Sequence, residues 1–192
     1  MNTQAAVELE HYRLDAAAST FKVQAFAQGL LSAFGHDPVF GVQDFNGEAQ
    51  FVAGTFENAS LQLNVNANSL RVVNDIKDKD RQDIERTLRD EVLETGKYPE
   101  IVFQSSNIAL SRAGNNRYRA RVIGDLTLHG VTQKNLWLNG EVTLTPEGLR
   151  AKGDFAIKQS DYGIKRVSVA GGTLKIKDEV KGAFDILARR AQ

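Results

Sequence analysis

The sequence predicts a mainly β, antiparallel protein, and three observations carry this prediction. Apolar and polar residues alternate with a period of two in several segments, which is typical of strands that bury one face. Short turn signals separate these segments, and this favours antiparallel neighbours in a sandwich or a barrel. The chain has 192 residues, which fits one domain over 1–192 with a core large enough to fold without a disulfide or a metal.

The alternation places the expected strands in order along the chain. In the segment 61–67, Leu61, Leu63 and Val65 share one face, while glutamine and asparagine occupy the other. Further strands are expected at 101–110, 117–128, 136–144, 154–158 and 180–186. Turn residues rich in glycine, asparagine or proline lie at 113–116, 146–148 and 171–172. Residues 27–38 are expected to hold a short helical turn or a bent loop, and residues 1–9 and 189–192 are expected to fray.

One segment departs from this pattern. Residues about 77–96 are highly charged, and their apolar residues follow helical spacing: Ile84, Leu88, Val92 and Leu93. Gly96 is a plausible stop, with Pro99 shortly after it. We expect one amphipathic helix that lies over an end of the β-structure, with its apolar stripe serving closure and packing.

The composition excludes several classes of function. The chain has no cysteine, which excludes disulfides, thiolate nucleophiles and cysteine-bound zinc. Acidic and basic residues balance at 24 each, and no basic stripe favours nucleic acid as a partner. The three histidines lack the spacing of a metal site, so neither a metal nor another cofactor is expected. Motifs of serine hydrolases and nucleotide-binding loops do not occur.

The start of the chain has no basic region, apolar stretch or cleavage pattern typical of an export signal. No apolar run approaches the ~20 residues that span a bilayer. We therefore expect a cytoplasmic protein without a transmembrane segment. A start site assigned too far downstream would instead allow a periplasmic location.

Five segments, taken in order, resemble the YceI-like family, also called polyisoprenoid-binding proteins. Residues 12–27 are similar to the family's opening strand, and residues 42–51 to its Phe-x-x-Phe-x-Gly hairpin. Residues 97–108 resemble its Tyr-Pro-x-Ile-x-Phe-x-Ser element, and GDLTLHGVTQ at 124–133 resembles its best-known signature. SDYGI at 160–164 is similar to its Asp-Phe-Gly-Ile, with Tyr162 in place of phenylalanine. The matches cover about residues 12–188.

This resemblance implies an extended, lipocalin-like antiparallel barrel of eight strands, with the helix over the barrel. It also implies a long apolar tunnel for an isoprenoid or another amphiphilic lipid, and a binding protein rather than an enzyme. Two departures stand out. Residues 30–38 replace a more regular strand found in many members, and the export signal of the many periplasmic members is missing.

The inward face of the expected strands mixes large side chains with small ones such as Gly124, Gly140 and Gly182. Small inward residues are expected to leave room for a ligand, whereas a packed core would favour larger groups. The expected tunnel lining consists of Phe21, Val23, Leu61, Leu63, Val65, Phe103, Val122, Leu126, Leu128, Leu138, Val142, Phe155, Ile157 and Phe184.

Polar residues in two loops are candidates for holding a lipid head group at the tunnel mouth. Two cations beside the mouth could bind a phosphate or a carboxylate, whereas the alternative is a solvated, charged turn. In the loop before Pro38 the alternative is a hydrogen bond that fixes the loop. The candidates are His36, Asp37, Asp161, Tyr162, Lys165 and Arg166.

The leading hypothesis is therefore the binding, storage or transport of a long amphiphilic lipid such as a polyisoprenoid. Its partner would be a hydrophobic small molecule, either an isoprenoid or a fatty-acid-like lipid. Two alternatives stay open. One is an enzyme acting on a hydrophobic substrate, with His36 or His129 at the mouth as its acid–base group. The other is a ligand-free scaffold barrel that acts through its surface or as a homodimer.

Overall fold

The structure is a computed structural model that describes residues 9–28, 37–52, 54–169 and 174–191. Its elements follow the chain in this order: β1 (Leu9–Gln24), β2 (Ala27–Gln28), β3 (Val39–Val42), β4 (Phe45–Val52), β5 (Ser60–Asn66), η2 (Ala67–Ser69), β6 (Leu70–Val72), α1 (Asp78–Thr87), η3 (Leu88–Val92), β7 (Glu100–Gly114), β8 (Arg117–Leu128), β9 (Val131–Thr145), β10 (Gly148–Lys158), η4 (Gln159–Tyr162), β11 (Ser168–Val169), β12 (Leu174–Ile176) and β13 (Glu179–Arg190).

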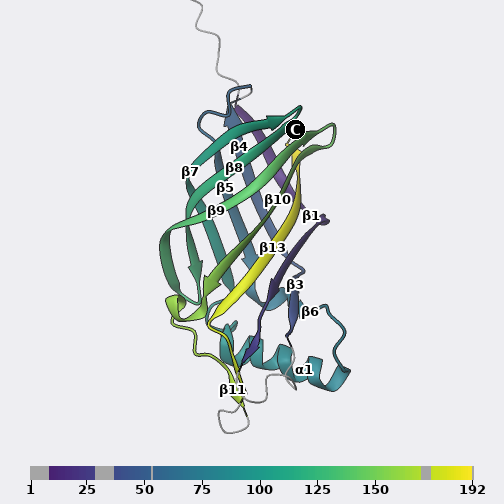
Figure 1. Cartoon of the computed structure of the whole chain (residues 1–192), viewed down its shortest axis with the longest axis vertical. Helices are drawn as coiled ribbons and strands as arrows, with labels where there is room; N and C mark the ends of the chain where they lie inside the picture. The colour runs from purple at the N-terminus through teal and green to yellow at the C-terminus, as the bar shows by residue number, and fades with distance from the viewer. Residues whose placement is uncertain (1–8, 29–36, 53, 170–173, 192) are drawn as a thin grey trace, which may run out of the picture.

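Eight of these strands form a closed, elongated antiparallel barrel (Figure 1). Its strands follow the order β13, β10, β9, β8, β7, β5, β4 and β1, and the pairing of β1 with β13 closes it. This arrangement confirms the predicted eight-stranded barrel. Closure also removes the unpaired edges that an open sheet would expose.

β1 pairs with different strands along its two halves. Its first half pairs with β4, while its second half continues along β13 and also pairs with β3. A bulge between Asp15 and Thr20 separates the halves. Ser19 within the bulge donates its hydroxyl to the Asp15 carbonyl oxygen (2.5 Å) and accepts from the Leu187 amide (2.9 Å). A bulge bends a strand, so it lets β1 follow the barrel wall and extend beyond it.

The helix lies across one end of the barrel, as predicted, next to β3 and β6 (Figure 1). The Glu85 carboxylate anchors it by accepting from the Val72 amide (2.8 Å). The helix ends earlier than the predicted Gly96, because Glu94 adopts a left-handed backbone conformation at φ 44°. Before that, η3 widens into a π-type turn in which the Leu93 amide donates to the Leu88 carbonyl (2.8 Å). This turn buries both Val92 and Leu93 against the barrel.

Two hydrophobic clusters occupy the barrel. The larger one lies at the helix end and includes Phe40, Val65 and Tyr162. The smaller one contains Tyr12, Phe51, Leu149 and Ala188. Tyr12 stacks on Phe51 with their ring centroids 5.3 Å apart. The smaller cluster therefore fills the end of the barrel at the turn between β9 and β10, called here the hairpin end, with side chains.

One local prediction is wrong. Residues 9, 189 and 190 do not fray, because Leu9 pairs with Val52 of β4, and Arg189 and Arg190 pair with Arg13 and Tyr12 of β1. In the segment 27–38, residues 27 and 28 form a short strand that pairs with β12, and the helical turn or bent loop expected in this segment stays a prediction. Residues 29–36 lie outside the described residues.

Candidate functional site: an apolar cavity under the helix

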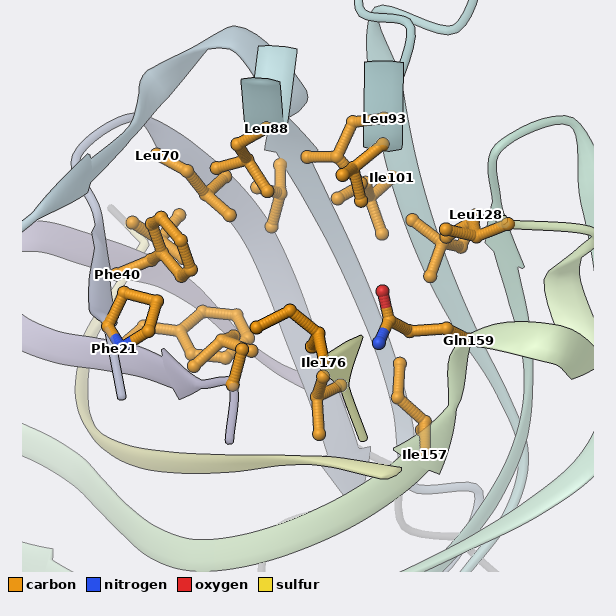
Figure 2. Close-up of a pocket in the computed structure, with 18 of the residues that line it drawn as sticks. Phe21, Phe40, Leu70, Leu88, Leu93, Ile101, Leu128, Ile157, Gln159 and Ile176 are labelled. Atoms are coloured by element: carbon orange, nitrogen blue, oxygen red, sulfur yellow. The ribbon is translucent and has the colours of Figure 1, made fainter. Parts of the chain in front are cut away.

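A cavity of about 400 Å³ lies between the helix and the barrel interior (Figure 2). Its walls are almost entirely hydrocarbon, which is typical of sites for apolar small molecules. The lining residues come from the barrel strands, the helix and the segments around η4: Phe21, Val23, Ala25, Pro38, Phe40, Val42, Leu63, Val65, Leu70, Asp83, Ile84, Thr87, Leu88, Val92, Leu93, Ile101, Phe103, Leu126, Leu128, Phe155, Ile157, Gln159, Ile164, Val167, Ile176 and Val180.

Cross-strand register explains why these side chains converge. On neighbouring strands Leu63 pairs with Phe103, and Phe103 pairs with Leu126. Two residues further along β5, Val65 pairs with Ile101. Paired residues project from the same face of a sheet, so two alternate rows of apolar side chains form one wall of the cavity.

Aromatic rings close the cavity toward the middle of the barrel. A Cβ atom on Gly182 would lie 2.1 Å from the Phe155 ring, and one on Gly153 would lie 2.6 Å from the Phe184 ring. Likewise, a Cβ on Gly124 would lie 2.5 Å from the Phe103 ring. The prediction that small inward residues leave free space is therefore wrong at Gly124 and Gly182, because the rings occupy the space beside them.

The structure brings nine of the predicted lining residues together in the cavity wall: Phe21, Val23, Leu63, Val65, Phe103, Leu126, Leu128, Phe155 and Ile157. Five others lie outside it: Leu61, Val122, Leu138, Val142 and Phe184. Val142 belongs to the smaller cluster, and the Phe184 ring packs beside Gly153 and against the larger cluster without lining the cavity.

The helix and the short segments contribute lining residues that the strand pattern does not predict. The stripe of Ile84, Leu88, Val92 and Leu93 is predicted to serve closure and packing, and all four also line the cavity. Phe40 and Val42 lie two residues apart in β3, so the period-two pattern of a strand could have predicted both as lining residues. Gln159 carried no such signal, since a polar residue is not expected on an apolar wall.

The predicted head-group residues do not form one cluster in the structure. His36 lies outside the described residues. The Asp37 carboxylate accepts from the Ala27 amide (2.7 Å), and its backbone carbonyl accepts from the Asn74 side chain (3.2 Å), so this residue fixes the loop. Lys165 and Arg166 are exposed between Ile164 and Val167, which both line the cavity. Binding of a head group by these cations stays a prediction.

The last two head-group candidates, Asp161 and Tyr162, differ in burial. The Asp161 side chain is exposed, and its backbone carbonyl accepts from the Gln133 amide (2.5 Å). Tyr162 is only 1 % exposed and belongs to the larger cluster, outside the cavity lining. Its assignment to the mouth is wrong, because η4 ends at Gly163 in a left-handed conformation (φ 68°) that leaves Tyr162 packed inside.

Burial has a measurable consequence for Tyr162 and Tyr12. It raises the pKa of each phenol from 10.0 to about 12, with smaller contributions from Asp161 at Tyr162 and from Glu10 at Tyr12. Because the unfolded tyrosines ionise first, the stability that burial of the neutral rings confers is present below pH 10 and is lost as the pH rises toward 12. The loss is at most about 3 kcal/mol per tyrosine.

We therefore expect the free energy of unfolding to fall steeply between pH 10 and 12. Urea unfolding at a series of pH values measures this slope, and the absorbance of ionised tyrosine at each pH reports the titration. In the variant Tyr162→Phe the slope is expected to be about half that of the parent. If the free energy of unfolding falls as steeply with pH in Tyr162→Phe as in the parent, the buried Tyr162 phenol is not a cause of the loss.

His129 joins three segments beside the cavity. Its Nδ1 donates to the Tyr162 carbonyl oxygen (3.2 Å), and its Nε2 lies 2.6 Å from a Glu94 carboxylate oxygen. Its ring also contacts Tyr98, with centroids 4.5 Å apart. His129 therefore links the end of the helix to the β8–β9 turn and to η4, and it lies outside the cavity lining.

We expect His129→Asn to lower the free energy of unfolding by about 1.5–3 kcal/mol, since it removes a hydrogen bond to a charged group. Asparagine tolerates the left-handed backbone at this position (φ 52°), so the change tests the side chain. Thermal and urea unfolding of His129→Asn, Glu94→Gln and the double variant measure the coupling. Additive effects would contradict a direct interaction.

Within the described ranges, no group of three or more histidine, aspartate or glutamate side chains could hold a metal ion. Across that same part of the chain, no helix is both long and apolar enough to cross a membrane.

Comparison with known proteins shows which family this chain resembles. A model of the YceI-like domain matches residues 12–188, which confirms the resemblance over the same span. A UPF0312 protein of Pseudomonas savastanoi is 29 % identical over 164 residues, which cover 82 % of this chain and 80 % of that protein. A UPF0312 protein of Shewanella denitrificans is 28 % identical over 185 residues, covering 92 % and 89 % of the two chains.

Two solved structures share the fold. A polyisoprenoid binding domain from Saccharophagus degradans, implicated in plant cell wall breakdown, superposes with a TM-score of 0.66 at 18 % identity. That match covers 94 % of this chain and 98 % of the domain. BcnA of Burkholderia cenocepacia superposes with a TM-score of 0.65 at 20 % identity, covering 90 % and 98 % of the two chains.

Proposed function

The chain belongs to the YceI-like domain family, and from this premise we propose that it binds, stores or transports a long amphiphilic lipid in the cavity under α1. The observation that carries the proposal is the apolar cavity of about 400 Å³ inside a closed barrel. The likeness to a polyisoprenoid binding domain supports a lipid of the isoprenoid class.

The size of the cavity sets the energetics of such a complex. At ~30 Å³ per water-sized group, the cavity has room for about a dozen methylene groups. Burying them would contribute about 10 kcal/mol, at ~0.8 kcal/mol each. Association costs about 4–15 kcal/mol in lost freedom. These terms are comparable, so the protein would exchange its lipid with a bilayer, as a carrier or store does, rather than hold it irreversibly.

The two other functions have less support. An enzyme would need its acid–base group in the cavity. Both ring nitrogens of His129 are engaged by Tyr162 and Glu94 outside the lining, and His36, the other candidate, lies outside the described residues. A ligand-free scaffold would need a filled interior, and the cavity argues against that. We therefore propose a binding protein without catalytic activity.

Native mass spectrometry of the protein as purified from cells tests the proposal. We expect a bound apolar molecule of several hundred daltons, and uptake of a fluorescent hydrocarbon dye by protein stripped of it. If neither a bound species nor dye uptake is found, the carrier function is wrong.

A further inference from the structure

The side chain of Gln159 reaches into the cavity. Gln159 follows directly after β10, is only 7 % exposed and is part of the cavity lining. Its amide group projects into the space between Leu93, Leu128 and Ile176 (Figure 2). A buried amide on a hydrocarbon wall is costly unless its hydrogen-bonding groups find partners.

The orientation of this amide follows from its neighbours. The Nε2 group donates to the Lys177 carbonyl oxygen (2.8 Å). The Gln159 backbone is also held, because its amide donates to the Asp178 carbonyl (2.9 Å) and its carbonyl accepts from the Ile164 amide (3.1 Å). A flipped side chain would bring two oxygen acceptors together. The carbonyl oxygen Oε1 is therefore the group left for the cavity, and no donor of the described residues binds it.

The rest of the described lining offers no positive charge to an anion. Its other polar side chains, among the residues described, are Asp83 and Thr87 on α1. The Asp83 carboxylate already accepts from Arg86 at 2.8 Å. No lysine or arginine of the described residues is part of the wall. A carboxylate or phosphate inside the cavity would therefore lose its hydration and find no cation. The donors left for it are neutral, namely the Thr87 hydroxyl and the second N–H of the Gln159 amide.

We propose that Gln159 is a specificity-determining residue that selects a ligand with a neutral hydrogen-bond donor, namely a hydroxyl group on a hydrocarbon chain. The hydroxyl donates to Oε1 of Gln159, and the chain lies along the apolar walls. This inference rests on the proposed function and names the class of lipid that the cavity takes. A hydrogen bond of this kind changes affinity by about tenfold.

Three probes with the same twelve-carbon chain test it: 1-dodecanol, 1-methoxydodecane and dodecanoate. The ether keeps the oxygen but has no donor, and dodecanoate is an anion. Their dissociation constants are measured by displacement of a fluorescent hydrocarbon dye, for the parent and for Gln159→Met. In the variant, we expect 1-dodecanol to bind about tenfold more weakly relative to the ether than in the parent. This ratio of ratios cancels the different hydrophobicities of the probes.

A second measurement needs only a folded parent protein. The side-chain amide of Gln159, assigned in NMR spectra of the parent by through-bond correlation to its own side chain, is expected to shift when 1-dodecanol is added and to stay unshifted with the ether. Equal shifts for both probes, or tighter binding of dodecanoate than of 1-dodecanol, would overturn the selectivity while leaving the proposed function intact. Failure of the dye and all three probes to bind would instead overturn the proposed function, and the inference with it.

Discussion

Replacing Leu126 with arginine is expected to weaken binding of a hydrocarbon chain at least a hundredfold, about 2.7 kcal/mol. Leu126 of β8 pairs with Phe103 of β7, and both side chains line the cavity. The longer arginine side chain fills part of the space that the ligand needs. Its guanidinium group also brings a charge toward a wall that offers almost no polar partner, so water must enter with it. Titration with the fluorescent hydrocarbon dye measures the loss.

The matched control for this variant is Gln104→Arg. Gln104 is exposed on β7, next to Phe103 in sequence and opposite Asp125 in register, so the same charge is added to the outer face of the barrel. This control is expected to bind the dye like the parent. Circular dichroism and urea unfolding establish that both variants are folded. Undiminished dye binding by a folded Leu126→Arg protein would show that the ligand binds elsewhere.

The barrel could be predicted from the sequence because alternation survives along most of its strands. Leu63 and Val65 both face the cavity, and so do Leu126 and Leu128, as a period of two requires. Alternation indicates which face is inward, but it does not indicate depth along the barrel. For that reason Val122 and Leu126, on the same strand and with the same parity, were assigned to one tunnel, although only Leu126 reaches the cavity.

What a residue does inside the barrel depends on its partners across the strands. Gly182 was expected to leave room, but the Phe155 ring lies over it. Gln159 was not predicted at all, because its position in the cavity depends on η4 and on the Lys177 carbonyl that binds its amide. Neither relation is visible in the local sequence pattern, since each joins residues that are distant along the chain.

Replacing Phe184 with alanine is expected both to destabilise the barrel and to deepen the cavity. Phe184 of β13 pairs with Phe21 of β1 and with Gly153 of β10. Its ring lies 2.6 Å from the position of a Cβ on Gly153 and 3.7 Å from one on Gly140, so no other side chain can fill that space when the ring is removed. Truncation of a fully buried phenylalanine costs about 3–5 kcal/mol, and because Phe184 is only half-buried we expect a loss at the lower end of this range or below it. Urea unfolding measures this cost.

The same change is expected to alter the preferred length of the ligand. The Phe184 ring packs against the larger cluster just outside the cavity lining. Its loss is therefore expected to give a longer chain additional wall to contact, at about 0.8 kcal/mol per methylene group. Binding of 1-hexadecanol relative to 1-decanol should therefore increase. Phe51→Ala is the matched control, since it removes a buried ring from the cluster at the hairpin end, which does not line the cavity. If both variants change the chain-length preference equally, the ring of Phe184 is not what limits the depth of the site.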